Sequence, residues 1–282
     1  MKRGDRRGVA LIFVLCLLVL LGVIVAEVVA QARMEAGILS SLRSRTVARY
    51  SAESGILAAT VRIETLLDSM RSLPDRITML RDLNARLTSL NDVDLGSGRF
   101  GVAVVDLNAR IDLNRADAAT LQGLFRQFTT DKRAEEVVDL LKAAPLYRLG
   151  ELADIPGIDD SLALAVAPYV TVWSDGFVNI NSAPEPVLAA LPGVSSATAR
   201  SIVRRRESGE VFLATTGPLG PLGGTPGGVV NARAPHVSAM PSRLLIVGRG
   251  WQDGHPLTHE IQAVYLVAGA RLVLLAWQER DL

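Results

Sequence analysis

The side chains best suited to hold a metal ion lie near the carboxyl end of the 282-residue chain. His255 and His259 are four residues apart, and Asp253 and Glu260 lie beside them. On a helix this spacing would place both imidazoles on one face, as in many zinc sites. Pro256 and the alternating apolar residues that follow indicate a strand instead, where residues four apart are separated by about 13 Å. We therefore expect no metal site here.

A second group of oxygen donors, Asn91, Asp92 and Asp94, lies in a polar segment rich in turn residues. Their spacing is not that of an EF-hand loop, so a solvated turn is expected, with a structural calcium ion as the alternative. The sequence contains no nucleophile elbow, P-loop or dinucleotide-binding motif. We expect neither catalytic residues nor a cofactor, and hence no enzyme. The single cysteine, Cys16, excludes an internal disulfide and lies in an apolar run.

The composition is that of a folded protein and not of a nucleic-acid-binding one. Hydrophobic residues make up 49% of the chain and the mean hydropathy is +0.28, which is too apolar for a disordered protein. The 30 basic residues are nearly balanced by 29 acidic ones. Nucleic-acid-binding domains usually carry a clear excess of positive charge.

The amino-terminal segment predicts a membrane helix. Four basic residues and one acidic residue lie within residues 1–8, and residues 9–26 are uncharged. Eighteen helical residues span about 27 Å, close to the thickness of a bilayer core. The basic flank places the amino end in the cytoplasm and the rest outside. A cleaved signal peptide is the alternative, because residues 30–32 resemble a cleavage box, but the length of the apolar run and its helical continuation favour a retained helix.

A single long helix is predicted for residues 9–70, which contain no proline. Pro74 ends or kinks this helix, and a second helix follows over residues 77–90. Beyond the apolar run, the apolar residues of the long helix recur at steps that keep them on one face. They are Leu39, Leu42, Tyr50, Leu57 and Val61.

The rest of the chain consists of a strand, a helical block and further strands. Residues 99–106 predict a strand from their β-branched content, and residues 111–212 form short helical pieces. Residues 214–228 form a loop rich in glycine and proline. The last strands are predicted at residues 243–248, 258–267 and 271–278. We expect the helical block to be inserted into a small α+β domain, with separate helical and sheet domains as the alternative.

The helical block contains an internal repeat. Residues 111–116 (IDLNRA) match residues 178–183 (VNINSA) at an offset of 67, and each segment ends where a helix can begin. Residues 152–158 (LADIPGI) likewise match residues 188–194 (LAALPGV). A Pro-Gly-apolar turn between two helices is the signature of a helix-hairpin-helix motif.

These features resemble a known family. Gly8, followed by four apolar residues and a long apolar helix, resembles the leader of prepilins, which prepilin peptidase cuts after the glycine. Most prepilins carry glutamate at the fifth mature position, where this chain has Phe13. Residues 177–207 and 50–59 are similar to segments of the minor pseudopilin K family of type II secretion, and together with the apolar fifth residue they indicate that family.

The resemblance implies an α+β fold, in which a long N-terminal pilin-like helix packs on a small antiparallel sheet. An all-α domain of the helix-hairpin-helix or SAM-like type would be inserted. The implied divisions are a leader (1–8), a transmembrane pilin helix (9–30), the remaining helix with the first strands (31–110), the inserted helical domain with two hairpin repeats (111–213), a Gly/Pro-rich loop (214–241) and the C-terminal strands (242–282).

The resemblance also implies a site and a role. Cleavage would fall between Gly8 and Val9, and the new amino group of Val9 would be methylated. The protein would be a single-pass inner-membrane protein with a periplasmic body. It would act at the tip of the pseudopilus and help to initiate and cap the fibre. The implied partners are the minor pseudopilins of types I and J, the fibre, prepilin peptidase and the inner membrane.

Two other readings share part of these features. Competence DNA receptors are also membrane-anchored and contain helix-hairpin-helix domains, whose turns offer backbone N–H groups to phosphate. Here Asp159 and Asp160 follow one turn and Ser195 the other, and loss of the leader leaves two more acids than bases. The cluster of Arg204, Arg205 and Arg206 is interpreted as a solvated helix end, so no nucleic acid is expected. A minor pilin of a type IV pilus is the remaining alternative.

Overall fold

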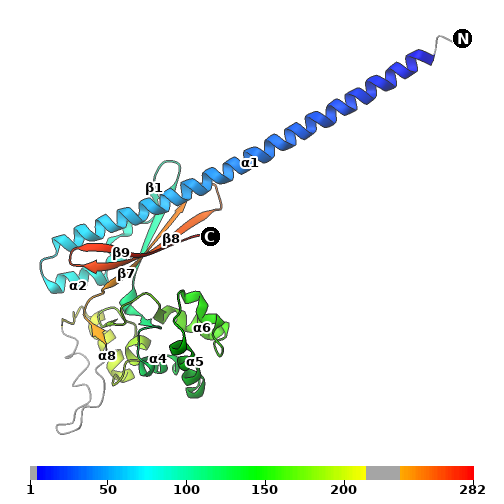
Figure 1. Cartoon of the computed structure of the whole chain (residues 1–282). Helices are drawn as coiled ribbons and strands as arrows, with labels where there is room; N and C mark the ends of the chain where they lie inside the picture. Colours follow the sequence, from blue (N-terminus) through cyan, green and yellow to red (C-terminus); the bar gives the residue numbers. More distant parts are fainter. Residues whose placement is uncertain (1–4, 214–235) are drawn as a thin grey trace, which may run out of the picture.

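The longest element of the chain is a helix that projects far beyond the folded body. The computed structural model describes residues 5–213 and 236–282, and helix α1 runs from Asp5 to Ser69 (Figure 1). The chain then turns into α2 (Leu73–Arg81), whose first turn contains Pro74 and is capped by the Ser72 side chain. Proline is favoured in a first turn because its missing N–H has no intrahelical partner there. Pro74 therefore begins the second helix, whereas the first has already ended at Ser69.

The second helical segment is broken into three pieces. After α2 the chain forms α3 (Leu83–Arg86) and the 3₁₀ turn η1 (Thr88–Leu90), although the sequence predicts one helix over residues 77–90. The break lies at Asp82, which has a non-helical backbone. Apolar side chains of these pieces still reach the core, among them Met79, Leu83 and Leu87.

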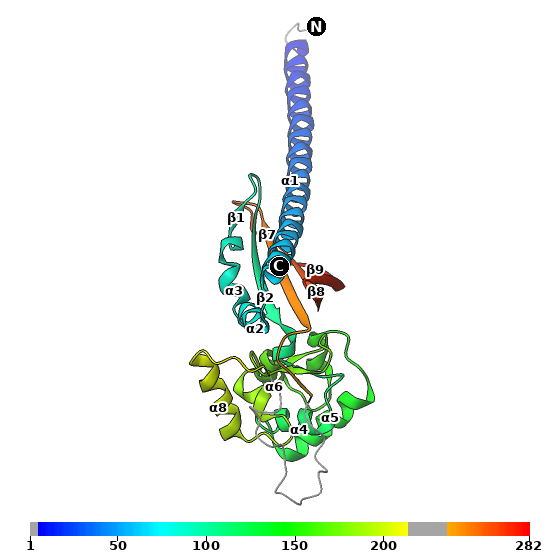
Figure 2. The same cartoon turned by 90° about the vertical axis from the view of Figure 1, so that its left-hand side faces the viewer.

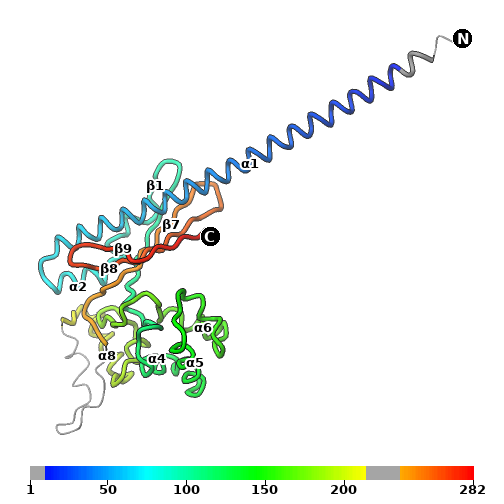
Figure 3. The backbone as a smooth tube through the Cα atoms, in the orientation of Figure 1, coloured from blue at the N-terminus to red at the C-terminus, as the bar shows by residue number. Residues whose placement is uncertain are grey.

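The C-terminal part of α1 packs on a five-stranded antiparallel sheet. The strand order is β1-β2-β7-β8-β9, so the neighbours β2 and β7 are separated in the sequence by the whole helical region (Figure 3). The strands are β1 (Val93–Asp94), β2 (Arg99–Asp106), β7 (Arg243–Trp251), β8 (Thr258–Ala268) and β9 (Arg271–Asp281). The predicted α+β class, with a long helix packed on an antiparallel sheet, is confirmed.

The face of α1 that meets the sheet is built from small and branched side chains. Ala48, Ala52 and Ala59 are fully buried there. Small residues allow the helix to approach β7 closely, where a methyl group at Gly250 would overlap the carbonyl oxygen of Ala48. The apolar face predicted from the sequence is a different one, and its residues are all exposed. Their exposed fractions are 67% for Leu39, 55% for Leu42, 63% for Tyr50, 66% for Leu57 and 56% for Val61.

The helical region lies at one end of the sheet, on the side opposite to the projecting part of α1 (Figure 2). It has its own core, which is separate from the core between α1 and the sheet. Its elements are η2 (Leu107–Ala109), β3 (Ile111–Asp112), α4 (Ala118–Phe125), α5 (Asp131–Ala143), η3 (Leu149–Asp154), α6 (Asp160–Val166), η4 (Ala167–Tyr169), β4 (Val170–Thr171), β5 (Val178–Asn179), α7 (Glu185–Ala189), α8 (Ser196–Glu207) and β6 (Val237–Ser238). The loop predicted at residues 214–228 lies outside the described residues.

Candidate interaction surfaces

The projecting part of α1 presents an uncovered apolar surface. Leu11 and Phe13 are 71% and 72% exposed, and the large apolar side chains that follow are also exposed. By length and composition the helix can cross a membrane. An apolar surface of this extent in water would drive association, so lipid or other helices must cover it. Gly8 and Val9, between which the sequence predicts cleavage, are the fourth and fifth residues of the same helix.

A second apolar surface continues along α1 beside the sheet. We call it the α1 stripe, and it consists of Leu39, Leu42, Tyr50, Leu57 and Val61. The stripe lies on the side of the helix opposite to the buried alanines, so the chain itself cannot cover it. Periodicity correctly placed these residues on one face. That face is available to another molecule.

The internal repeat is explained by an asparagine that closes each copy, buried in the second copy and half-buried in the first. Asn181 donates from Nδ2 to the carbonyl oxygen of Phe212 at 2.8 Å and accepts from the Phe212 N–H at 2.9 Å. Asn114, at the matching position, forms the same pair of bonds with Leu146, both at 2.8 Å. The asparagine at the fourth position of each motif thus holds the end of its helical pair, where the sequence predicted only the start of a helix.

Two further features recur, although the donor side chains of the first are 64 and not 67 residues apart. In the first copy Lys142 donates to the carbonyl oxygen of Ala116, and in the second Arg206 donates to that of Ala183 at 2.8 Å. Each copy is also closed by a short parallel strand pair, β3 with β4 and β5 with β6. The helical region is therefore two copies of one unit.

The strand pairing that closes each copy was not found from the sequence. The signal for it is visible: Ala-Pro precedes Tyr169-Val170-Thr171 and also precedes His236-Val237-Ser238, again 67 residues apart. Two-residue strands are too short for a periodicity argument, so only the repeat could have revealed them.

The first hairpin turn is not arranged to receive a phosphate. Gly157 and Gly193 both have positive φ, as the turns require. Asp159 caps α6 by accepting from the Leu162 N–H at 2.8 Å, and it pairs with Arg133 at 2.8 Å. The hydrogen bond from Arg133, together with the Leu162 N–H, holds the pKa of Asp159 below its usual value. A negative charge therefore occupies the helix end that would bind phosphate in a DNA-binding hairpin.

The arginine cluster at the end of α8 is a solvated helix end at Arg204 and Arg205, but not at Arg206, for which the sequence interpretation is corrected. Arg206 is largely enclosed and donates to the carbonyl oxygens of Ile180 and Ala183. Arg205 pairs with Glu210 and its guanidinium lies 4.8 Å from the ring centre of Phe212. Arg206 is therefore used inside the fold, and the charge of Arg205 is paired with that of Glu210 at the surface.

A buried polar network joins the helical region to the sheet. The Asn108 side chain is fully buried and donates to Asp175 at 2.7 Å and to the Phe177 carbonyl at 2.8 Å. Its oxygen accepts from the backbone N–H groups of Ser242 and Arg243. One side chain thus ties the exit from the sheet, after β2, to the return into β7.

Asp106, at the end of β2, belongs to the same junction. Its carboxylate accepts from Asn179 at 2.8 Å, from the Asn108 N–H at 2.8 Å and from the Ser182 hydroxyl. Burial raises the pKa of Asp106 because the charged form loses solvation, and these hydrogen bonds only partly offset that effect.

His259, one of the two histidines considered as metal ligands, contacts two carboxylates of β9. The ring nitrogens of His259 lie 2.7 Å from an Asp281 oxygen and 3.3 Å from a Glu279 oxygen. The same two carboxylates pair with Arg45 and Arg49 of α1. The cluster therefore fastens the end of β9 to the long helix.

Glu260 lies on the other face of β8 and is 1% exposed. Burial raises its pKa, but hydrogen bonds from Arg249, Gln262 and Arg280 outweigh burial, so its pKa lies below the usual value. Within residues 5–213 and 236–282, no group of three or more His, Cys, Asp or Glu side chains is arranged to hold a metal ion.

The candidate calcium donors are engaged within their own turn. Asp92 pairs with Arg99 at 2.8 Å, and Asp94 accepts from the Gly96 N–H at 2.6 Å. Both carboxylates therefore have partners that compete with a cation.

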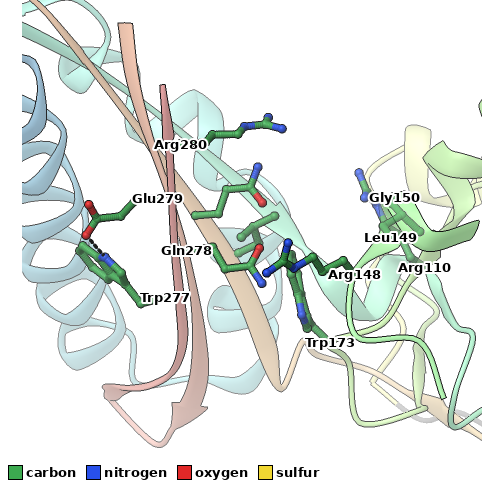
Figure 4. Close-up of a pocket in the computed structure, with 11 residues that line it drawn as sticks. Arg110, Arg148, Leu149, Gly150, Trp173, Trp277, Gln278, Glu279 and Arg280 are labelled. Carbon is green, nitrogen blue, oxygen red and sulfur yellow. Dashed lines mark hydrogen bonds between the residues drawn. The ribbon is translucent and has the colours of Figure 1, made fainter. Parts of the chain in front are cut away.

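A cleft of about 710 Å³ separates the sheet from the helical region (Figure 4). In Figure 4, Gln278 and Arg280 point from β9 into the cleft, while Trp277 and Glu279 point from the same strand toward α1. Arg148 extends from the helical region toward Gln278. We call this feature the arginine cleft; it is lined by Arg110, Arg148, Leu149, Gly150, Trp173, Leu245, Gln262, Trp277, Gln278, Glu279 and Arg280.

Comparison with known proteins gives one family and one fold. Residues 178–216 match the family described as "Type II secretion system (T2SS), protein K". Among solved structures, the fold is similar to a chain of the GspK-GspI-GspJ complex from the type 2 secretion system of enterotoxigenic Escherichia coli, with a TM-score of 0.59 over 89% of this chain and 99% of that chain. The sequence identity is 13%, so this likeness concerns the fold. No curated protein matches the sequence. The predicted resemblance to minor pseudopilin K is confirmed.

Proposed function

We propose that this chain is a minor pseudopilin at the tip of a periplasmic pseudopilus, in a type II secretion system, where it helps to initiate and cap the fibre. One observation carries the proposal: a single chain combines a projecting apolar helix, a pilin-like sheet and an inserted helical region whose second repeat matches protein K. The role is structural and requires no catalytic group or cofactor.

The projecting helix would act first as an anchor and later as part of the fibre. In the proposal the amino end is cytoplasmic, prepilin peptidase cuts between Gly8 and Val9, and the new amino group of Val9 is methylated. The basic residues of the leader support this orientation. The sheet and the helical region would then lie in the periplasm.

Phe13 supports a place at the tip. In pilins each entering subunit uses a glutamate at the fifth mature position to meet the amino-terminal charge of the subunit above it. An unpaired charge in an apolar bundle costs several kcal/mol, so this pairing matters. Phe13 cannot neutralise an amine above it, whereas the amine of Val9 can still meet a glutamate of the subunit below. A subunit of this kind is suited to be the first in the fibre.

The partners in the proposal are minor pseudopilins of types I and J. The solved relative comes from a complex with GspI and GspJ. In this chain the α1 stripe offers an exposed apolar surface to a neighbouring helix. The helical region would face outward, because a stacked neighbour would collide with it.

Site-specific photocrosslinking tests the assignment. A photoreactive residue at Tyr50, in the α1 stripe, should crosslink to the type I or type J subunit in cells that assemble the fibre. The same residue at Lys132, whose side chain is 89% exposed on α5, is the control and should give no such product.

Two further measurements complete the test. Mass spectrometry should find a methylated Val9 at the mature amino terminus, and immunogold labelling should place the protein at one end of the fibre. Label repeated along the shaft, or a terminus after residue 32, would contradict the proposal. Micromolar binding of duplex DNA at physiological salt, weakened by Arg204→Ala, would favour a DNA receptor instead.

A further inference from the structure

The last strand of the sheet has an edge with no neighbouring strand among the described residues; α1 covers only its beginning, where the Leu272 N–H donates to Glu64. β9 is the terminal strand in the order β1-β2-β7-β8-β9 and is eleven residues long. At the opposite edge, β1 has only two residues. Proteins usually protect a long edge with a proline, a lysine or a covering element, because free N–H and C=O groups invite another strand. β9 contains neither proline nor lysine, and Leu274, Leu275 and Trp277 are 49%, 45% and 38% exposed.

The direction of the free backbone groups follows from the pairing with β8. The Leu282 N–H donates to the Thr258 carbonyl at 2.8 Å, so the backbone groups of Leu282 face β8. Backbone direction alternates along a strand. Trp277, Glu279 and Asp281 therefore direct their N–H and C=O groups away from β8, toward the open edge. A strand placed there would find three consecutive bonding positions.

The two faces beside this edge differ in chemistry. On the side of α1 an added strand would meet Trp277. On the other side it would meet the arginine cleft, where Arg280 is paired with Glu260 but Arg148 forms no ion pair with the described residues. The guanidinium of Arg110 also has no hydrogen bond to them, and burial lowers its pKa although the charge of Asp106 opposes this shift. Arg110 is half-buried and Arg148 is exposed, and cations that form no ion pair favour an anionic ligand.

We propose that β9 accepts an extended segment of another protein as a sixth strand, and that alternate side chains of this segment are carboxylates that enter the arginine cleft. The intervening side chains would be apolar and would lie beside Trp277. Because side chains alternate between the faces of a sheet, one strand can satisfy both requirements. The backbone bonds would give affinity, and Arg110 and Arg148 would select the acidic sequence.

The direct test uses a fluorescein-labelled peptide of alternating valine and glutamate, added to the full chain in detergent micelles. Fluorescence anisotropy should show saturable binding that weakens as salt is raised. A matched peptide with lysine in place of glutamate should bind at least about tenfold more weakly, since one charge-assisted hydrogen bond is worth about that factor.

Paired variants separate the edge from the cleft. Trp277→Pro removes one outward N–H, and since that N–H does not pair with β8 the sheet should remain folded. It should weaken binding about tenfold or more, whereas Trp277→Ala keeps the N–H and should weaken binding clearly less. Arg148→Glu should abolish the preference for the acidic peptide, and Lys132→Glu on α5 should leave it unchanged.

Hydrogen exchange on the unmodified protein gives an independent readout, which does not depend on any variant folding. The peptide should slow exchange at the amides of Trp277, Glu279 and Asp281. Equal binding of the lysine peptide, equal losses for Trp277→Pro and Trp277→Ala, or protection confined to other segments would each overturn the proposal.

Discussion

Asn181 is expected to be the most sensitive polar residue of the helical region. The side chain is 1% exposed and forms three hydrogen bonds, two with the backbone of Phe212 and one with the carbonyl oxygen of Ala239 at 2.9 Å. Replacement by alanine leaves these backbone groups without partners. An unsatisfied buried group costs about 1–3 kcal/mol, and water can reach the half-enclosed bond to Ala239. We therefore expect Asn181→Ala to lower the free energy of unfolding by about 3–5 kcal/mol.

Asn114 provides the matched control, because it has the same role in the first copy. It forms two bonds instead of three, and both lie in partly buried surroundings. Water can replace part of what is lost, so Asn114→Ala should cost only about 1–2 kcal/mol. Asn181→Asp keeps the acceptor but turns a charged oxygen toward two carbonyl oxygens, and should be at least as damaging as alanine.

Denaturant titration followed by hydrogen–deuterium exchange measures the stability of the helical region separately from that of the sheet. The loss of protection in α8 should move to lower denaturant in the order Asn114→Ala, then Asn181→Ala. A cost below about 1 kcal/mol for Asn181→Ala, or a larger cost for Asn114→Ala, would refute the assignment of this asparagine as the closure of each copy.

Three other perturbations probe the sheet and the long helix. The pKa of Glu64 is lowered, chiefly because the Leu272 N–H donates to its carboxylate. Glu64→Gln should therefore lower the melting temperature above pH 4.5. The difference from the unsubstituted protein should vanish as the pH falls through the lowered pKa of Glu64. Gly250→Ala would place a methyl group against the backbone of α1 and should cost about 2–3 kcal/mol in a denaturation curve, whereas Gly37→Ala, with open space around it, should not destabilise. Phe13→Glu should still be found at the fibre end by immunogold labelling, since a glutamate at the tip needs no partner; loss of the protein from the fibre would contradict this.

The sequence predicted the long helix and the main strands closely, because these elements follow simple rules. An uninterrupted apolar run without proline gave α1, and β-branched residues gave β2. The later strands extend a few residues beyond the predicted ends, to Trp251, Ala268 and Asp281. Cross-strand pairing supports these additional residues, and pairing cannot be read from one strand alone.

The sequence was less informative wherever a residue's partner decides its role. Periodicity grouped Tyr50 and its neighbours on one face but could not tell whether the sheet or another molecule covers that face. Three successive arginines suggested a solvated helix end, yet Arg206 bonds to carbonyl oxygens of a segment more than twenty residues earlier. The repeat located Asn114 and Asn181, but only the folded chain reveals which backbone groups they hold.

The hydrogen bonds of Asn108 fix the orientation of the helical region relative to the sheet. This one buried side chain bonds to the helical region at Phe177 and to the segment that leads into β7 at Ser242. Asp106 reinforces the same point from the end of β2. Since β2 and β7 are neighbouring strands and both lie under α1, the helical region cannot rotate without breaking buried hydrogen bonds. The residues that the helical region contributes to the arginine cleft are therefore held at a fixed distance from β9. A force on the helical region is transmitted through the sheet to the long helix.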